Sequence, residues 1–402
     1  MSANRNELDP PASTDPVRPG GTAAAGTNAG GAGARAARTG RTAPGGDAGG
    51  GSITDNPEIV AQIDQLIERV GGTALEAAGG SASFEARLVR DLIATGLKLI
   101  PDGRHTGELK LITTAVKELR YAFRVFGQYP EPHKVTIFGS ARTPRNHPDF
   151  AACVEFSKLM AEAGWMIITG AGGGIMEAGH QGPGREASFG VAIRLPFETT
   201  ANEVIAGDQK LIHFRYFFTR KLMFISQAEA VALFPGGFGT MDEAFEVLTL
   251  VQTGKASMIP IVLCEGAGET YWQEWDHLIR RGLGSRGWIS PEDHNLYQVC
   301  TTPQEAVDHI IRFYRNYHSS RYVRDDLVIR MQRRLSDQAV DTLNTEFAKL
   351  VKSGKMTQRG PLDVEDDHLH LPRLVFTHTR RDFGTVRRLI DRINQLDAAG
   401  SL

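Results

Sequence analysis

The apolar residues of the chain change their spacing twice, and each change predicts a different kind of structure. Residues 1–52 contain almost no large apolar side chains and consist mainly of Gly, Ala, Pro, Thr and Asn. Such a segment cannot bury enough surface to offset the entropy lost on ordering, so we predict a disordered tail. From 53 to 130, apolar residues recur at helical spacing, for example at Ile59, Ile63 and Leu66, and predict a helical N-terminal region.

A different pattern begins after residue 130 and continues to about residue 320. Short apolar runs that fit strands alternate with segments of helical period, which predicts an α/β domain with a Rossmann-like, doubly wound parallel sheet over 131–320. The expected strands are 135–138, 165–169, 190–195, 230–234 and 259–264, and the expected helices are 149–163, 175–182, 214–228, 241–253, 272–281 and 303–317.

The remaining residues, 321–402, show a shorter series of the same two patterns. A strand is expected at 322–329, a helix from Ser336 to 351, a second strand at 373–377 and a second helix at 383–396. This βαβα series predicts a small C-terminal α+β extension.

Composition excludes several classes of partner. The net charge of the 402-residue chain is −2, so no global basic field attracts nucleic acid. No apolar run approaches the roughly 20 residues that span a bilayer, and the amino terminus lacks the apolar core of a secretory signal. We therefore expect a cytoplasmic protein without membrane or nucleic-acid partners. The three cysteines, Cys153, Cys264 and Cys300, and the scattered histidines lack metal-ligand spacing, so we expect no metal.

Three glycine-bearing turns each follow a predicted strand, at 139–142, 169–177 and 235–240. In a parallel sheet these turns emerge at one edge, where ligands bind, although each turn alone would also serve close packing. Their N–H groups and a following helix N-terminus favour an anion, and the absence of a Gly-Lys-Ser/Thr sequence favours a monophosphate over a triphosphate. The candidate phosphate- and substrate-binding residues are Gly139, Ser140, Arg142, Thr169, Gly172, Gly173, Gly174, Met176, Glu177, Gly236, Gly237, Gly239 and Thr240.

Polar residues near the third turn have two interpretations each. Thr240 and Glu243 have the T-x-x-E spacing of a capping box, so Glu243 could serve only to cap its helix. Arg220 would ordinarily be a surface cation, but its neighbours are mostly apolar, so it must find an anion or reach solvent. Lys221 is either a surface residue or a phosphate contact.

The segment from Pro235 to Glu243, PGGFGTMDE, resembles the signature PGGxGTxxE of the LOG ("lonely guy") family of nucleoside 5′-monophosphate phosphoribohydrolases. Many members of that family are labelled lysine decarboxylases. The helix with Arg220 and Lys221 stands where the family keeps its own Arg-Lys helix. The resemblance, strong from about Lys134 to Phe313, implies that Glu243 and Arg220 are catalytic, that no cofactor is needed and that the chain forms a homodimer or a higher homo-oligomer.

The resemblance implies hydrolysis of the N-glycosidic bond of a nucleoside 5′-monophosphate, with AMP favoured and a cytokinin riboside monophosphate as a narrower alternative. A carboxylate suits this reaction because positive charge builds on the ribose as the bond breaks. Two other interpretations stay open. The scaffold also resembles the molybdenum-cofactor carriers, which bind a phosphorylated pterin without turnover, and the single-stranded-DNA-binding Rossmann proteins, against which the net charge argues.

Overall fold

The structure, a computed structural model, describes residues 56–77, 83–131, 133–194 and 201–399 and divides into two units, 1–102 and 103–402. The predicted disordered tail, 1–52, lies outside the described residues. Within the described ranges, no helix is both long enough and apolar enough to cross a membrane.

The described part of the first unit is a pair of helices, α1 (Pro57–Ala77) and α2 (Phe84–Lys98). Ile63 and Ile67 of α1 pack against Ala86 of α2 in a small apolar cluster. An ion pair of 2.5 Å joins the carboxylate of Asp64 to the guanidinium of Arg90. The helices that the apolar spacing predicts are therefore present and bury a shared face.

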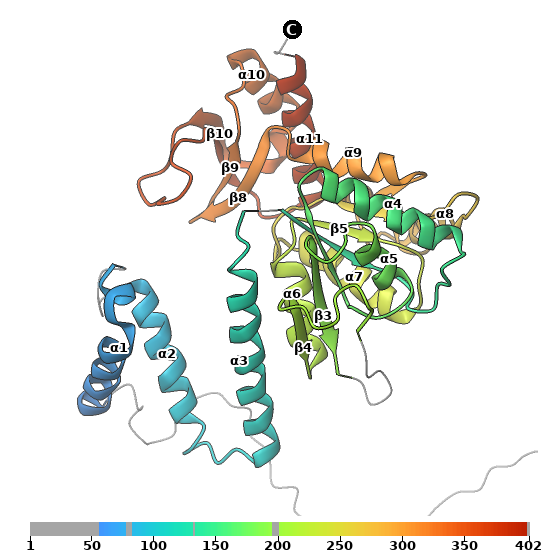
Figure 1. Ribbon diagram of the computed structural model, residues 1–402. Coiled ribbons are helices and arrows are strands. Elements are labelled where there is room, and N and C mark those ends of the chain that lie inside the picture. The colour runs from blue at the N-terminus through green and yellow to red at the C-terminus, as the bar shows by residue number, and fades with distance from the viewer. Residues whose placement is uncertain (1–55, 78–82, 132, 195–200, 400–402) are drawn as a thin grey trace, which may run out of the picture. The chain divides into compact units, whose positions relative to one another are not determined.

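A parallel sheet of seven strands forms the centre of the second unit (Figure 1). Its order is β4-β3-β2-β1-β5-β6-β7, so the chain builds outward from β1 to β4 and then returns to add β5 on the other side of β1. The predicted α/β class with a doubly wound sheet is confirmed, and its switch point lies between β1 and β5. The strands are β1 (Lys134–Phe138), β2 (Met166–Thr169), β3 (Ser188–Ile193), β4 (Leu211–Phe214), β5 (Ala230–Leu233), β6 (Ile261–Cys264) and β7 (Gln298–Cys300).

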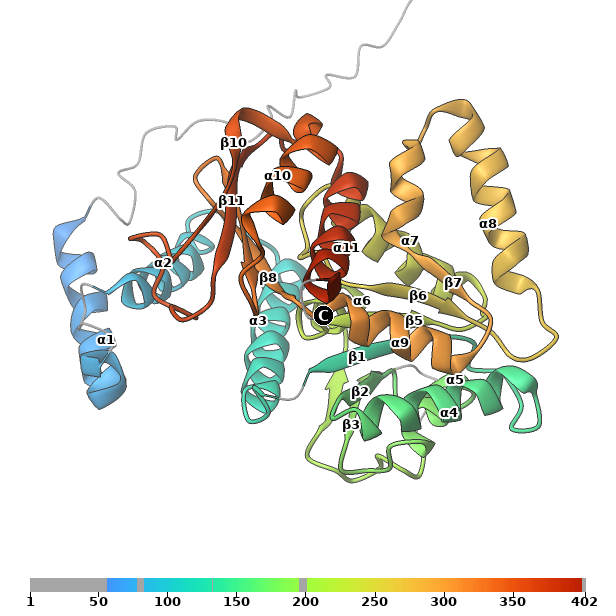
Figure 2. The ribbon, with the colours of Figure 1, turned by 90° about the horizontal axis from the view of Figure 1, so that it is seen from above.

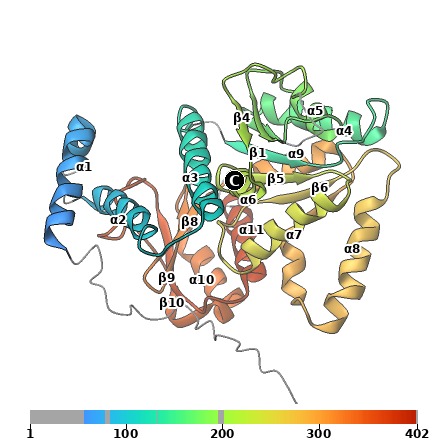
Figure 3. The ribbon, with the colours of Figure 1, turned by 90° about the horizontal axis from the view of Figure 1, so that it is seen from below.

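Helices cover both faces of the sheet because successive strand residues point to opposite sides. On β2, for example, Ile167 belongs to the apolar core on one face and Ile168 to the core on the other. Figures 2 and 3 show the helices on the two faces of the sheet from above and below. One face carries α4 (Pro148–Glu162), α5 (Ile175–Gln181) and α9 (Pro303–Phe313), and the other carries α3 (Thr106–Phe126), α6 (Phe217–Ser226), α7 (Phe238–Gln252) and α8 (Tyr271–Gly282).

The C-terminal residues form a module with a four-stranded antiparallel sheet of order β10-β11-β9-β8. The module shares an apolar core with the parallel sheet. Asn394 also accepts hydrogen bonds from the backbone N–H groups of Asn316 (2.8 Å) and Tyr317 (3.0 Å), just beyond α9. The elements are β8 (Tyr317–Val323), β9 (Asp326–Met331), α10 (Asp337–Glu346), β10 (Val351–Arg359), β11 (Arg373–His378) and α11 (Phe383–Ala399), and 3₁₀ turns lie at Gly284–Arg286, Pro291–Leu296 and Ala348–Leu350.

A close contact joins this module to α7. Gly254 follows α7 with a φ of +67°, and a Cβ atom there would lie 2.2 Å from the ring of Phe383, the first residue of α11. Only glycine fits this position, because both the conformation and the space exclude a side chain.

The structure corrects three sequence-based assignments. The helix expected at 214–228 begins only at Phe217, because Phe214 ends a strand, β4, that was not expected. The strand expected at 322–329 is a hairpin, β8 and β9, and the helix expected to reach 351 ends at Glu346. β10 was not expected because it is a largely exposed edge strand without an apolar period. The module is thus ββαββα and not βαβα.

Candidate active site

The three glycine-bearing turns contact one another at the carboxyl edge of the sheet. The turn after β1 lies in the middle: the N–H of Ser140 donates to the carbonyl oxygen of Pro235 in the turn after β5 (3.0 Å). The carbonyl oxygen of Ser140 accepts from the N–H of Ile175, which follows the turn after β2 (3.0 Å). The turns therefore meet beside the switch point between β1 and β5, where α/β sheets bind ligands.

Two glycines make this contact possible. A Cβ atom at Gly236 would lie 2.1 Å from the Oγ1 of Thr240 and 2.9 Å from the backbone nitrogen of Ser140. Gly174 has a φ of +61°, and its Cβ would lie 2.4 Å from the carbonyl oxygen of Ser140. By contrast, no described atom lies within 4 Å of a Cβ built on Gly237 or Gly239. The first pair allows the turns to pack, whereas the second pair leaves room for a ligand.

A cavity of about 800 Å³ opens at the turns, and we name it the turn cavity. A neighbouring cavity of about 630 Å³, the side cavity, shares part of its wall. The turn cavity is lined by Ile137, Phe138, Gly139, Ser140, Ala141, Arg142, Gly170, Met176, Phe217, Arg220, Gly236, Gly237, Phe238, Gly239, Thr240, Met241, Asp242, Glu243 and Tyr271. The side cavity is lined by Ala141, Gly170, Ala171, Gly172, Met176, Ala192, Ile193, Arg194, Ala201, His213, Phe217, Arg220 and Gly239.

Helix α7 begins at Phe238, three residues earlier than the spacing predicts, with Gly237 as its N-cap. Thr240 therefore lies inside the helix, and no side chain in the described part of the chain caps the first N–H groups. The capping-box interpretation of Thr240 and Glu243 is wrong for this reason. An uncapped helix N-terminus beside a cavity attracts an anion through its N–H groups and its dipole.

Glu243 lies in the second turn of α7 with its side chain 12% exposed. Its Oε2 is buried, and none of the described residues forms a hydrogen bond with it. Burial raises the pKa of the carboxyl group from 4.5 to about 7, although the nearby Lys221 and Arg220 cations lower it. A carboxyl group with its pKa near neutrality and an oxygen that accepts no hydrogen bond is poised for proton transfer or for stabilising a positive charge.

Lys221 is surrounded by carboxylates. Its Nζ lies 2.6 Å from Glu246, 2.8 Å from Asp242 and 3.8 Å from Oε2 of Glu243. Burial alone would lower the pKa of the ammonium group, but the hydrogen bonds to Asp242 and Glu246 outweigh this and raise it. Lys221 does not line either cavity, so its contacts are to the carboxylates of α7.

Arg220 lies at the wall that the two cavities share. Its Nε donates to the carbonyl oxygen of Val191 on β3 (3.0 Å), and its guanidinium carbon lies 5.1 Å from the ring centre of Phe224. A Cβ atom at Gly170 would lie 2.7 Å from its Nη2, so the guanidinium group reaches the turn after β2. The backbone acceptor and the ring hold this cation at the cavity.

The structure brings most of the sequence-predicted residues to one cavity. Thr169 instead is buried as the last residue of β2, where its Oγ1 accepts from the N–H of Ala171 (3.0 Å). Glu177 pairs with the guanidinium of Arg145, away from both cavities. The turn cavity contains Gly139, Ser140, Arg142, Met176, Arg220, Gly236, Gly237, Gly239, Thr240 and Glu243; the side cavity contains Gly172; Thr169, Gly173, Gly174, Glu177 and Lys221 line neither.

Several lining residues escaped the sequence analysis. Tyr271 begins α8, and its hydroxyl group donates to the carbonyl oxygen of Gly236 at 2.5 Å, which braces the turn after β5. The strand pattern could have indicated Tyr271, because this residue follows β6 in the chain and therefore lies at the carboxyl edge of the sheet. Arg194 and His213 line the side cavity from the ends of β3 and β4, and β4 itself was not predicted.

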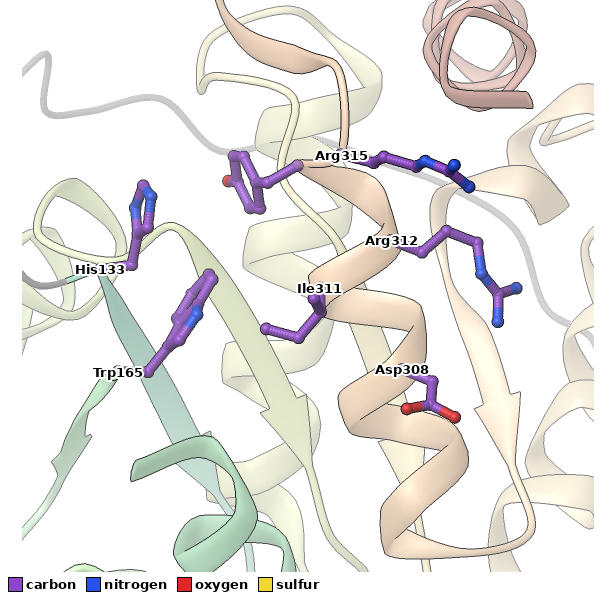
Figure 4. A pocket seen from close by; sticks show the side chains of 7 residues that line it. His133, Trp165, Asp308, Ile311, Arg312 and Arg315 are labelled. Carbon is purple, nitrogen blue, oxygen red and sulfur yellow. The ribbon is translucent and has the colours of Figure 1, made fainter. Parts of the chain in front are cut away.

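A separate hollow of about 550 Å³ lies at the opposite edge of the sheet (Figure 4). His133 and Trp165 precede β1 and β2 there, and their rings pack with centroids 4.9 Å apart. Figure 4 shows Arg312 and Asp308 of α9 pointing away from these two rings. The hollow is thus mostly aromatic packing, and it lies at the amino ends of the strands, where α/β sheets do not bind ligands.

Comparisons with known proteins give one family match and a set of solved structures. Residues 171–310 match the sequence model of a family described as "Possible lysine decarboxylase". No match was found among proteins with curated descriptions. The matched range includes α6, β5 and α7 but begins after the turn that follows β1.

Solved structures with a similar arrangement cover 45–47% of this chain. The protein TM1055 is 22% identical, with 99% of its chain covered and a TM-score of 0.33. The molybdenum cofactor carrier protein of Chlamydomonas reinhardtii is 18% identical (98% covered, TM-score 0.33), and DNA processing protein A of Helicobacter pylori is 11% identical (83% covered, TM-score 0.30). Likenesses of this size do not identify a function.

The family match and the sequence resemblance concern the same elements. The signature from Pro235 to Glu243 and the Arg-Lys helix both fall within the matched range. Residues 171–310 thus carry both the match to the family described as possible lysine decarboxylase and the resemblance to the LOG family.

Proposed function

We propose that this protein hydrolyses the N-glycosidic bond of nucleoside 5′-monophosphates and releases a free base and ribose 5-phosphate, with AMP as the first substrate to test. One observation carries the proposal: the buried carboxyl group of Glu243, with an oxygen that forms no hydrogen bond with a described residue, lines the same cavity as the three glycine-bearing turns. A carboxyl group in that setting fits a reaction in which positive charge develops next to a bound phosphate.

The chemistry divides among the residues of the turn cavity. The uncapped N-terminus of α7 and the turn after β1 bind the phosphate, with Arg142 at the same wall. This anchoring positions the ribose over Glu243. The binding energy of the phosphate then lowers the barrier to reaction at the anomeric carbon of the ribose. The ionised carboxylate of Glu243 stabilises the oxocarbenium-like ribose and orients the attacking water. Arg220 assists departure of the base from the shared wall.

A panel of nucleoside 5′-monophosphates, assayed for free base, tests the proposal. We expect turnover of 5′-monophosphates but not of the matching nucleosides, because the turns need the phosphate. Arg220→Ala is expected to lower kcat about 100-fold, since it removes a cation from the reacting region. Binding of the nucleotides without release of base would instead support a carrier function.

Lys221 is expected to tune the reaction through Glu243. Because the Lys221 cation lowers the pKa of Glu243, Lys221→Met should raise that pKa and move the acid limb of the kcat/KM profile to higher pH. We expect a loss of about 2- to 5-fold at pH 7 that shrinks at pH 9, where the carboxylate is ionised in both proteins. Lys158→Met, which removes an exposed lysine that pairs with Glu162, is the control. An unshifted profile would argue against this coupling.

Decarboxylation of lysine is not supported by the residues present. Such an enzyme holds pyridoxal phosphate on a lysine. Of the described residues that line the turn cavity and the side cavity, none is a lysine. Lys221 is held by Asp242 and Glu246, and these carboxylates keep its ammonium group protonated.

A further inference from the structure

Residues 202–206, between β3 and β4, hold the turn after β2 from outside. The backbone N–H of Asn202 donates to the carbonyl oxygen of Ala171 (2.8 Å), and its side-chain Nδ2 donates to the carbonyl oxygen of Gly172 (3.0 Å). The fully buried Ile205 packs in the same apolar cluster as Ala171. Asn202 thus binds two consecutive carbonyl groups of a turn that lies far from it in the sequence.

The buried imidazole of His180, on α5, fixes the orientation of the Asn202 amide. Its Nε2 lies 2.9 Å from the carbonyl oxygen of Phe189 on β3 and 3.0 Å from the Oγ1 of Thr169. Because a carbonyl oxygen only accepts hydrogen bonds, Nε2 carries a hydrogen. Burial lowers the pKa of His180, so the ring is neutral at pH 7 and its Nδ1 is an acceptor. The Nδ2 of Asn202 lies 3.1 Å from this Nδ1 and donates its second hydrogen there.

The conformation of Ala171 explains why the turn needs these hydrogen bonds. Ala171 has a φ of +64°, in the left-handed region that residues with a Cβ atom rarely adopt. Its carbonyl oxygen accepts from Asn202, and its N–H donates to the Oγ1 of Thr169 (3.0 Å). The residue is therefore bound on both sides, and the turn keeps a conformation that alanine alone disfavours.

The position of this turn shapes both cavities. Gly170 lines the turn cavity and the side cavity, and Gly172 lines the side cavity. A Cβ atom at Gly170 would lie 2.7 Å from the Nη2 of Arg220, and one at Gly172 would lie 2.6 Å from the Cε of Met176. The backbone of the turn therefore packs directly against two side chains of the shared wall, and a displaced turn would change the shape of that wall.

We infer that Asn202, oriented by His180, is a positioning residue that keeps the turn after β2 in the shape that binds the nucleotide. Neither side chain is among the described residues that line the two cavities, so both act through the turn. This inference rests on the proposed function for the identity of the ligand.

Asn202→Ala tests the inference in the full-length protein. In a Glu243→Gln background, in which AMP is turned over too slowly to disturb calorimetry, we expect AMP to bind about 10-fold more weakly, because loss of the side-chain hydrogen bonds releases the turn. In the active enzyme, KM for AMP should rise to match. The value of kcat should change less than KM, since Arg220 keeps its hydrogen bond to Val191.

Two further variants separate positioning from stability. Ala171→Gly, added to Asn202→Ala, should recover part of the affinity, because glycine adopts a positive φ without a clash. Asn344→Ala is the matched control: Asn344 is also half-buried, and its Nδ2 also donates to two backbone carbonyl groups, those of Val340 and Met356, in the C-terminal module. This control should lower the melting temperature and leave the affinity for AMP unchanged.

An Asn202→Ala variant that binds AMP as the wild type does would overturn the inference, and so would an equal loss of affinity in Asn344→Ala. Failure of the proposed function would be seen separately, as no base released from any nucleotide.

Hydrogen–deuterium exchange tests the inference even if no nucleotide binds. The amides of residues 170–174 should exchange about 10-fold faster in Asn202→Ala than in the wild type, since the turn opens locally. They should exchange at the wild-type rate in Asn344→Ala. Equal exchange of this turn in Asn202→Ala and the wild type would contradict the inference.

Discussion

Glu243→Gln is expected to lower kcat for release of base by about 10³-fold while the protein stays folded. Glutamine keeps the shape of the side chain but removes the negative charge that would face the developing positive charge on the ribose. The assay is release of base from a 5′-monophosphate under saturating conditions, with circular dichroism as the check on folding. A folded variant that retains wild-type activity would show that another group performs this step.

The same substitution should stabilise the protein at neutral and higher pH. The folded-state pKa of Glu243 lies at about 7, above its ordinary value of 4.5, so the folded protein binds more protons than the unfolded chain between these values. The contribution of this group to stability therefore falls as the pH rises from about 4.5 to about 7. This loss amounts to at most about 3 kcal/mol.

Glutamine does not ionise, so the Glu243→Gln variant does not lose this stability as the pH rises. The melting temperature of Glu243→Gln should thus exceed that of the wild type at pH 8, and the difference should disappear near pH 4. Equal melting temperatures at pH 8 would mean that the carboxylate is better solvated than its burial indicates.

Gly236→Ala is expected to damage both folding and activity. The new methyl group would lie 2.1 Å from the Oγ1 of Thr240 and 2.9 Å from the backbone nitrogen of Ser140, so the turn after β5 must move away from the turn after β1. Overpacking of this kind costs roughly 1–3 kcal/mol of unfolding free energy. The displaced turn should also lower kcat/KM by about 100-fold, because small misplacements of the substrate are costly.

Gly239→Ala is the matched control for this substitution. It lies in the same signature, within the first turn of α7, but no described atom lies within 4 Å of the added methyl group. Its melting temperature should equal or exceed that of the wild type, since alanine favours a helix over glycine. If Gly236→Ala were as stable as Gly239→Ala, the contact between the two turns would not be needed for the fold.

Five strands of the parallel sheet and the three turns could be predicted because each depends on local sequence, whereas β4 and β7 were missed. Buried strands read as short apolar runs, and glycines after them mark turns that must share one edge. The helix of Arg220 was harder to delimit, since β4 and α6 are both apolar and only Arg215 and Tyr216 separate them. β10 carries almost no apolar signal, because an exposed edge strand buries few side chains.

The finer chemistry of the site depends on residues that are distant in sequence. Lys221 contacts three carboxylates of α7, and no spacing rule relates them. Thr169 ends a strand and resembles an anion ligand in the sequence, but its hydroxyl group is bonded to the backbone of Ala171 and Met176. The start of α7 at Phe238 was also missed, because glycine at Gly237 and Gly239 argues against a helix unless the turn before it is known.

Because Gly254 packs against Phe383, the two ends of α7 face different parts of the protein. Its N-terminal turns carry the carboxyl group of Glu243, and its C-terminal end abuts the first residue of α11. The C-terminal module therefore packs against the far end of the helix that carries Glu243.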